Sequence, residues 1–215
     1  MKKLDTPTLT WRSSVLRAVS EAAPADRAAR LELLSAVQDG YSAHETLVRL
    51  WRPLTTGPIP PDTARMFLDI SAPEPPSRPT TAQVVAYASL VLLAADARLA
   101  LDLKASTLVG HERIADLAAL HAEVGEACVQ AGALLAAGAR PAPGPELDRF
   151  VAAHATALGA ADSPAFRRAL NRRTAPDRNP RLRRYWHLAG EITGEAAPMG
   201  VAHTWLLDAL NASAA

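Results

Sequence analysis

Asp96 and His121 are the two residues whose types and positions best suit acid–base chemistry. Asp96 shares one face of a predicted helix with Leu92 and Leu99, because side chains three and four residues apart lie on the same side of a helix. His121 occupies the middle of a second apolar helix face. A buried carboxyl or imidazole is costly unless it is paired or neutral. These two side chains are therefore our candidate catalytic residues, if the protein is an enzyme.

Two long predicted helices, residues 80–104 and 111–137, carry these side chains. The connection between them is short, so they should lie antiparallel, with the turn near residues 107–108. That turn places Asp96 about one helical step from the position opposite His121. In one interpretation, Asp96 binds an arginine or a helix N-terminus and His121 is an ordinary core histidine. In the other, both project into an internal cavity and bind a ligand or act as acid and base.

Aromatic residues supply the rest of the predicted binding site. They make up only 5% of a chain that is rich in alanine. Large rings commonly fill a core, but small alanines can also leave room between helices, which the rings then line. Both interpretations stay open at this point. The predicted ligand-binding residues are Trp51, Tyr87, Asp96, His121, Tyr185, Trp186 and Trp205.

Motifs for nucleotide binding, metalloprotease chemistry and serine hydrolysis are missing from this sequence. The one cysteine, Cys128, excludes a disulfide within the chain and zinc sites built from paired thiolates. Cys128 lies in an apolar helical stretch. One interpretation is a small buried hydrophobe, and the alternative is a nucleophile. The histidines never fall three or four residues apart, so we predict no metal site and no cofactor. They are His44, His111, His121, His154, His187 and His203.

The fold class follows from the residues that dominate the chain. Ala, Leu, Arg and Glu favour helices, and alternating β-branched runs are missing. A chain of 215 residues with 49% hydrophobic content can bury a core. The 17 prolines and 11 glycines cluster between the apolar runs. We predict an all-α fold, a single orthogonal or antiparallel bundle of nine or ten helices around a long central helical hairpin.

Residues 72–79 are the clearest candidate for a linker. They hold four prolines in eight residues, a composition that favours extended backbone. We predict one helical domain over residues 1–215. The alternative is an N-terminal subdomain, residues 1–71, which this linker separates from a main bundle, residues 80–215.

The charge balance bears on partners. Lys and Arg number 23 against 22 Asp and Glu, a net charge of +1, which argues against direct nucleic-acid binding. The eight arginines of residues 166–186 fit the surface of helices. The N-terminus lacks the apolar run of a signal peptide and residues 84–95 are too few to span a bilayer, so we expect a cytoplasmic protein without a membrane partner. Exposed leucines on the first helices serve either a homodimer or the core.

The C-terminal third is similar to a pattern of the form D-P-R-x-x-R-Y-W-x-L-x-x-x-I-N-G, then a proline-containing turn, then A-x-x-W-L-x-x-A-L, although Asp177 lies three residues before Pro180. Thr193 stands where the pattern has Asn. The matching residues are Asp177, Pro180, Arg181, Arg184, Tyr185, Trp186, Leu188, Ile192, Gly194, Pro198, Ala202, Trp205, Leu206, Ala209 and Leu210. In this pattern, residues 158–211 resemble the end of the effector-binding region of actinobacterial MerR-family transcriptional regulators.

MerR regulators begin with a winged helix-turn-helix of the form R-Y-Y-x-x-x-G-L, which residues 1–60 do not match. The resemblance therefore implies a helical ligand-binding module without a DNA-binding head. We expect a stand-alone protein that binds a hydrophobic natural product or drug-like metabolite between the central hairpin and the last two helices. One alternative is a cofactor-free cyclase or isomerase of secondary metabolism, in which Asp96 or His121 polarises a carbonyl. Another is a transcriptional regulator that acts through a partner.

Overall fold

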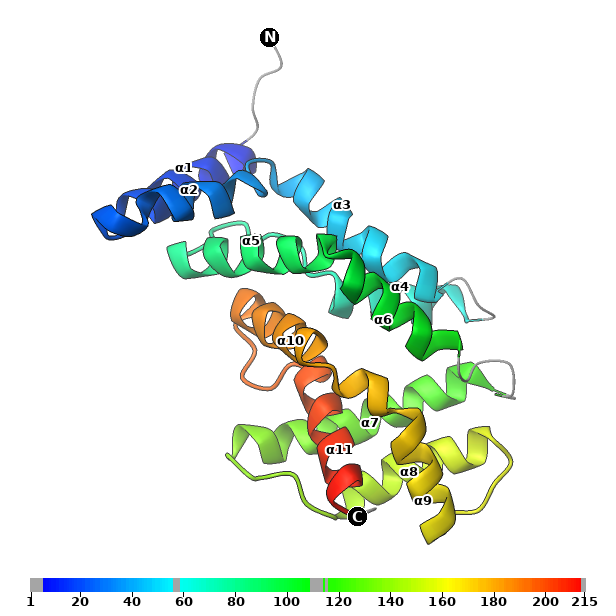
Figure 1. The fold of residues 1–215 in the computed structure, drawn as a ribbon. Helices are drawn as coiled ribbons and strands as arrows, with labels where there is room; N and C mark the ends of the chain where they lie inside the picture. The colour runs from blue at the N-terminus through cyan, green and yellow to red at the C-terminus, as the bar shows by residue number, and fades with distance from the viewer. Residues whose placement is uncertain (1–5, 56–58, 109–113, 115, 214–215) are drawn as a thin grey trace.

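The computed structural model describes residues 6–55, 59–108, 114 and 116–213. The regular structure of these residues is entirely helical, so the predicted all-α class is confirmed (Figure 1). The α-helices are α1 (Thr6–Ser20), α2 (Arg27–Ser35), α3 (Gly40–Trp51), α4 (Pro61–Ser71), α5 (Thr81–Ala95), α6 (Ala97–Leu108), α7 (Leu117–Ala136), α8 (Pro145–Ala157), α9 (Pro164–Arg173), α10 (Pro180–Thr193) and α11 (Met199–Ser213). The described residues also form the short 3-10 helices η1 (Pro24–Asp26), η2 (Arg52–Thr55) and η4 (Ala175–Arg178).

Local sequence signals account for where several helices begin and end. The Thr80 hydroxyl accepts from the backbone N–H of Gln83 at 3.1 Å, and the Gln83 side chain accepts from the Thr80 N–H at 3.0 Å, which closes a capping box on α5. Ser163 and Asn179 cap α9 and α10, each directly before a proline in the first helical position. Gly194 ends α10 with a φ of 75°, a left-handed conformation that glycine adopts without strain.

The helix predicted over residues 80–104 is broken at Asp96. α5 and α6 meet there at a bend of 64°. Asp96 has extended backbone, with a ψ of 114°, and its carboxylate accepts from the N–H of Arg98 at 2.9 Å. That bond satisfies a free N–H of the new helix, so Asp96 acts as the cap of α6. The break raises the number of α-helices in the described residues to eleven, and the predicted nine or ten was wrong.

The described helices form two layers (Figure 1). α5 packs on α10, α3 and α1 in one layer, whereas α7 packs on α8 and α11 in the other. The predicted central hairpin of residues 80–104 against 111–137 is therefore not the spine of the described structure. α10 and α11 are joined by a short connection and lie in different layers, so they link the two.

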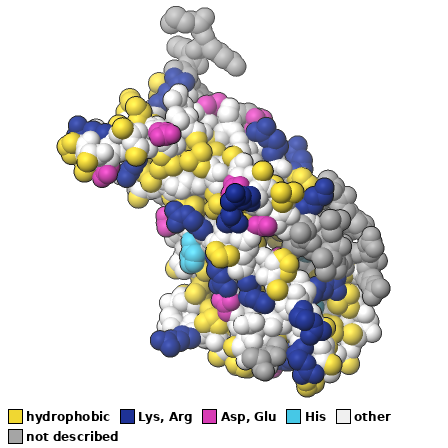
Figure 2. All heavy atoms as spheres, viewed as in Figure 1, with side chains coloured by type: hydrophobic (Ala, Val, Ile, Leu, Met, Phe, Trp, Pro, Cys, Tyr) yellow, Lys and Arg dark blue, Asp and Glu magenta, His cyan; other side chains and the backbone are white. Residues whose placement is uncertain are grey.

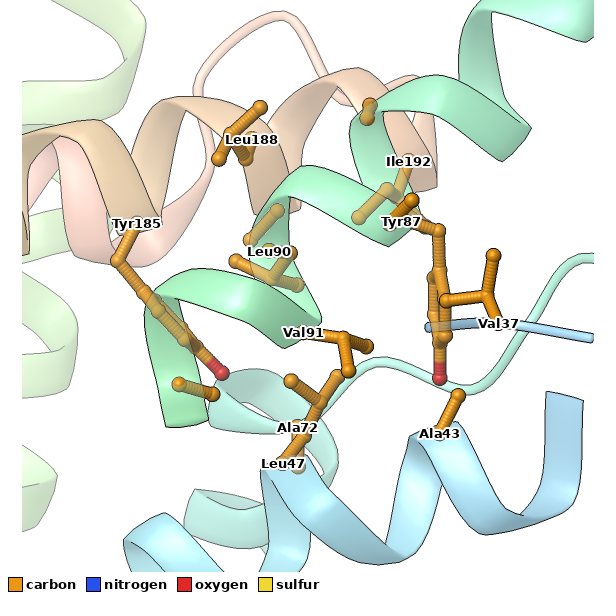
Figure 3. Close-up of a cluster of buried hydrophobic side chains, with 14 of the residues drawn as sticks. Val37, Ala43, Leu47, Ala72, Tyr87, Leu90, Val91, Tyr185, Leu188 and Ile192 are labelled. Carbon is orange, nitrogen blue, oxygen red and sulfur yellow. The ribbon is translucent and has the colours of Figure 1, made fainter. Parts of the chain in front are cut away.

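The first layer has a core that residues from α1 to α5 share with α10. Figure 3 shows Tyr87 of α5 and Tyr185 of α10 among aliphatic side chains of this core. Tyr87 donates its hydroxyl hydrogen bond to the carbonyl of Pro73 at 3.2 Å, and Tyr185 donates to the carbonyl of Ser71 at 2.5 Å. These bonds fasten the segment around residues 72–79 to the core, which has members on both sides of that segment in the sequence.

The second layer has its own core. Ala127 and Cys128 of α7, Phe150 of α8, Leu170 of α9 and several residues of α11 form it. Trp205 belongs to this cluster, and its Nε1 donates to the carbonyl of Ala139 at 3.0 Å. The indole therefore fixes the connection between α7 and α8 onto α11.

The arginines of residues 166–186 include several with acidic partners. Arg167 binds Asp148 and Asp162, each at 2.6 Å, and Arg183 binds Asp208 at 2.5 Å. On the face drawn in Figure 2, basic, acidic and hydrophobic side chains are interspersed. This pattern fits the predicted role of the arginines as helix-surface charge.

The apolar helices are the elements to consider as candidate membrane spans. Among residues 6–55, 59–108 and 116–213, none of the helices is by itself both long and apolar enough to cross a bilayer. α5 and α6 reach the required length and composition only together, and their axes are bent by 64° at Asp96.

Candidate ligand-binding cleft

A cavity of about 590 Å³, the main cavity, lies where the two layers meet. Side chains from α3, α4, α6 and α10 line it, and so do side chains from α7, η4 and α11. Met66 of α4 is about half exposed, so part of the lining faces solvent. Cavities of this size and apolar character bind drug-sized molecules in many proteins. The side chains that make it apolar include Trp51, Phe67, Ile70, Leu103, Val124, Leu182 and Trp186.

A smaller cavity of about 220 Å³, the side cavity, adjoins it. Leu54, Phe67, His121 and Asp177 line both cavities. The side cavity continues between α8 and α9, where its lining includes His154. Because the two cavities share four lining residues, we treat them as one two-part cleft.

Two tryptophans form the aromatic wall of the main cavity. The rings of Trp51 and Trp186 lie 5.0 Å apart between centroids at an angle of 34°. Trp51 also packs edge-on against Phe67 at 5.7 Å. Trp186 lies so close to the backbone of Gly200 that a Cβ atom there would overlap the indole ring. The glycine at the start of α11 therefore sets how deeply Trp186 seats against that helix.

Three buried polar atoms around the cleft have no hydrogen-bond partner in the described structure: Trp51 Nε1, Ser71 Oγ and His154 Nε2. Trp51 is 3% exposed and Ser71 is 1% exposed, and both line the main cavity, whereas His154 lines the side cavity. Burial raises the pKa of the neighbouring Tyr185 hydroxyl, and the Trp51 N–H opposes this rise without reaching hydrogen-bond geometry. Unpaired buried polar atoms are rare and cost about 1–3 kcal/mol each, so three beside one cleft indicate a missing polar partner.

Three histidines, His121, His154 and His203, surround the junction of the two cavities. Phe150 packs edge-on against His154 at 4.7 Å and against His203 at 5.7 Å. Burial, together with the smaller effects of the nearby His203, Arg173 and His121, lowers the pKa of His154 to about 3. Burial also lowers the pKa of His203, against an opposing effect of the Asp177 carboxylate. His154 is therefore a neutral imidazole at pH 7.

Of the seven residues predicted to bind a ligand, three line the cleft: Trp51, His121 and Trp186. Trp51 ends α3, His121 is one turn into α7, and Trp186 lies in the middle of α10. They come from both layers, and no short-range sequence pattern brings them together.

The other four are engaged elsewhere. Tyr87, Tyr185 and Trp205 are core residues whose polar atoms are satisfied by backbone carbonyls. Asp96 caps α6 and lies 3.6 Å from the guanidinium of Arg181, and it lines neither cavity of the cleft. The predicted contact between Asp96 and His121 is thus replaced by the helix-end and arginine contacts of the alternative interpretation.

Sequence reasoning missed Ser71, His154, Asp177 and His203. His154 follows Phe150 by one helical turn on an apolar helix, a signal equal to the one that singled out His121. Ser71 is the last residue of α4, and its position beside the cavity depends on the layer packing. Pattern alone does not reveal such a residue.

Cys128 lies in the wall of the main cavity at 3% exposure. Burial raises the pKa of its thiol to about 12, so the thiol stays protonated at neutral pH. This environment fits the interpretation of Cys128 as a small buried hydrophobe.

The cleft can form hydrogen bonds and exchange protons through its histidines. Across the described residues, no group of three or more His, Cys, Asp or Glu side chains is arranged to hold a metal ion. The cleft is an apolar, aromatic enclosure with a few polar atoms at its edges and at one end. No protein-family model, no curated protein and no solved structure matches the chain.

Proposed function

We propose that the protein binds a hydrophobic natural product or drug-like metabolite in the cleft between its two layers. The observation that carries the proposal is the coincidence of a main cavity of about 590 Å³ with three unpartnered buried polar atoms on the cleft walls. An apolar enclosure with a few placed polar groups is the usual form of a small-molecule site. A ligand that binds those atoms recovers part of the free energy that their burial costs.

The resemblance to MerR effector-binding regions supports the same conclusion. Two residues of the matching pattern, Asp177 and Trp186, line the main cavity. Others shape the α10–α11 hairpin that holds Trp186 in place: Gly194 ends α10, and the ring of Pro198 lies against Gly190. Two residues of the pattern thus belong to the cleft, while others hold α10 and α11 in place beside it.

Gly125 offers a test because it lines the main cavity and a Cβ there meets no atom within 4 Å. Gly125→Phe should fill the cavity without displacing its walls, whereas Gly125→Ala leaves most of the space open. Each variant is titrated with Nile red, an uncharged dye whose emission rises in apolar surroundings. We expect the wild type and Gly125→Ala to bind alike and Gly125→Phe to bind at least about tenfold more weakly, which is about 1.4 kcal/mol. Equal binding by all three, or none by the wild type, contradicts the proposal.

His203 favours a second candidate, a cofactor-free isomerase that uses the same cleft. The Asp177 carboxylate interacts electrostatically with His203, and both residues line the main cavity. Such a pair can remove a proton from carbon beside a carbonyl and return it to another carbon, while the carboxylate stabilises the imidazolium. The test is deuterium uptake from heavy water by α-tetralone, an apolar enolisable ketone. Uptake should be faster with the wild type than with His203→Asn, and uptake at the buffer rate contradicts this candidate.

A further inference from the structure

The side cavity differs from the main cavity in having a polar end. Its walls are mostly aliphatic and include Ile114, Leu120 and Leu170, while His154 contributes an unpartnered Nε2 atom. Its volume of about 220 Å³ exceeds the cavity of roughly 150 Å³ that holds benzene in an engineered protein. One substituted aromatic ring therefore fits beside His154.

The charges around the side cavity oppose an ionised ligand group. Arg173 and Asp177, of opposite sign, both line it, and each already has an interaction partner in the protein. The neighbouring His121 and His203 stand near the same imidazole. His154 itself is neutral at pH 7, since its pKa lies near 3. Because these two charges are opposite in sign, the lining of the side cavity favours neither a carboxylate nor an ammonium group.

A hydroxyl group satisfies His154 in either of its neutral forms. If Nε2 carries no proton, it accepts from the hydroxyl, and if it carries one, it donates to the hydroxyl oxygen. A carbonyl or a simple ether serves only one of these forms. The neutral imidazole, the aliphatic walls and the edge of Phe67 together suit a flat ring with one O–H group.

We propose that the side cavity binds the hydroxyaryl end of the ligand, with the phenolic O–H hydrogen-bonded to His154 Nε2. This assignment rests on the proposed function of the cleft, since the remainder of the ligand would occupy the main cavity. It narrows the ligand class to amphipathic molecules with an uncharged phenolic end and an apolar body.

Four probes that share a methyl-substituted benzene ring test the head group. They are para-cresol, para-xylene, para-toluate and protonated para-methylbenzylamine, and their dissociation constants are measured at pH 7 by two-dimensional NMR titration. We expect para-cresol to bind the wild type about tenfold more tightly than each of the other three. In His154→Phe, which keeps a ring but loses the nitrogen, the advantage over para-xylene should vanish. His154→Gln, which restores a polar group, should recover part of it.

His187→Phe is the matched control, because His187 is exposed on α10 and lines neither cavity. It should leave all four dissociation constants unchanged. Tighter or equal binding of para-toluate or the ammonium probe overturns the hydroxyaryl assignment, and so does a cresol advantage that persists in His154→Phe. If no ring probe binds while Nile red binding still responds to Gly125→Phe, the assignment fails and the proposed function stands. If Nile red binding also fails, both fail.

Discussion

Gly125 and Gly200 both line the main cavity, yet alanine should have opposite effects on stability at the two positions. Gly125 is inside α7 with no atom within 4 Å of an added Cβ, so Gly125→Ala gains about 0.5–1 kcal/mol from reduced backbone entropy of the unfolded chain. At Gly200 the added Cβ overlaps three carbon atoms of the Trp186 indole, one of them close to the backbone of α10. Overpacking of this kind costs about 1–3 kcal/mol. Gly200 is also the second residue of α11, where the helix gains less from alanine.

Thermal unfolding followed by circular dichroism measures both effects. A change of 1 kcal/mol shifts the melting temperature by about 2–4 °C in a chain of this size. We expect Gly125→Ala to melt roughly 1–4 °C above the wild type and Gly200→Ala to melt at least about 2 °C below it. Gly200→Ala should also weaken Nile red binding, because the indole must move toward the main cavity. Shifts of the same sign at both glycines would refute the described seating of Trp186 on α11.

Three further outcomes follow from the described contacts. Asp96→Ala should cost about 1 kcal/mol through loss of the α6 cap and leave Nile red binding unchanged, as urea unfolding and dye titration of the same sample will show. Tyr185→Phe should cost about 1–2 kcal/mol, since the carbonyl of Ser71 loses its donor inside the core, and urea unfolding measures this loss. Burial lowers the pKa of His154 from its ordinary 6.5 to about 3. Below pH 6.5 the unfolded chain binds a proton at this histidine and the folded chain does not, so the stability that is fully present above pH 6.5 is lost as the pH falls toward 3. Urea midpoints between pH 7 and pH 4 should therefore fall less steeply in His154→Gln than in the wild type.

Much of the helical content was predictable because its signals are local. The capping box at Thr80 and the Ser163 and Asn179 caps each need only a few consecutive residues, and the structure has all three. The break at Asp96 was not predictable from apolar spacing, because Leu99 and Leu103 keep helical period across it. The sequence does not distinguish a carboxylate that caps a helix from one in the core. The ψ of 114° at Asp96 in the structure identifies it as a cap.

The packing of helices against one another could not be derived in the same way. The hairpin prediction assumed that helices adjacent in the sequence pack against each other. α5 instead packs most extensively against α10, almost a hundred residues later in the chain. That long-range pairing decides which aromatic rings become core and which line the cleft. Tyr185 and Trp186 are adjacent in the sequence, yet the first is fully buried beside Ser71 and the second faces the main cavity.

The position of the cleft explains why its polar groups come from both layers. Trp51 and Ser71 belong to the first layer, whereas His154 and His203 belong to helices of the second. The α10–α11 hairpin connects the layers, and Arg183 of α10 binds Asp208 of α11 at 2.5 Å. A ligand that contacts Trp51 and His154 together adds a second connection across the same boundary. Its binding free energy then opposes separation of the layers. The free energy of unfolding should therefore rise by RT ln(1 + L/Kd), where L is the free ligand concentration and Kd its dissociation constant.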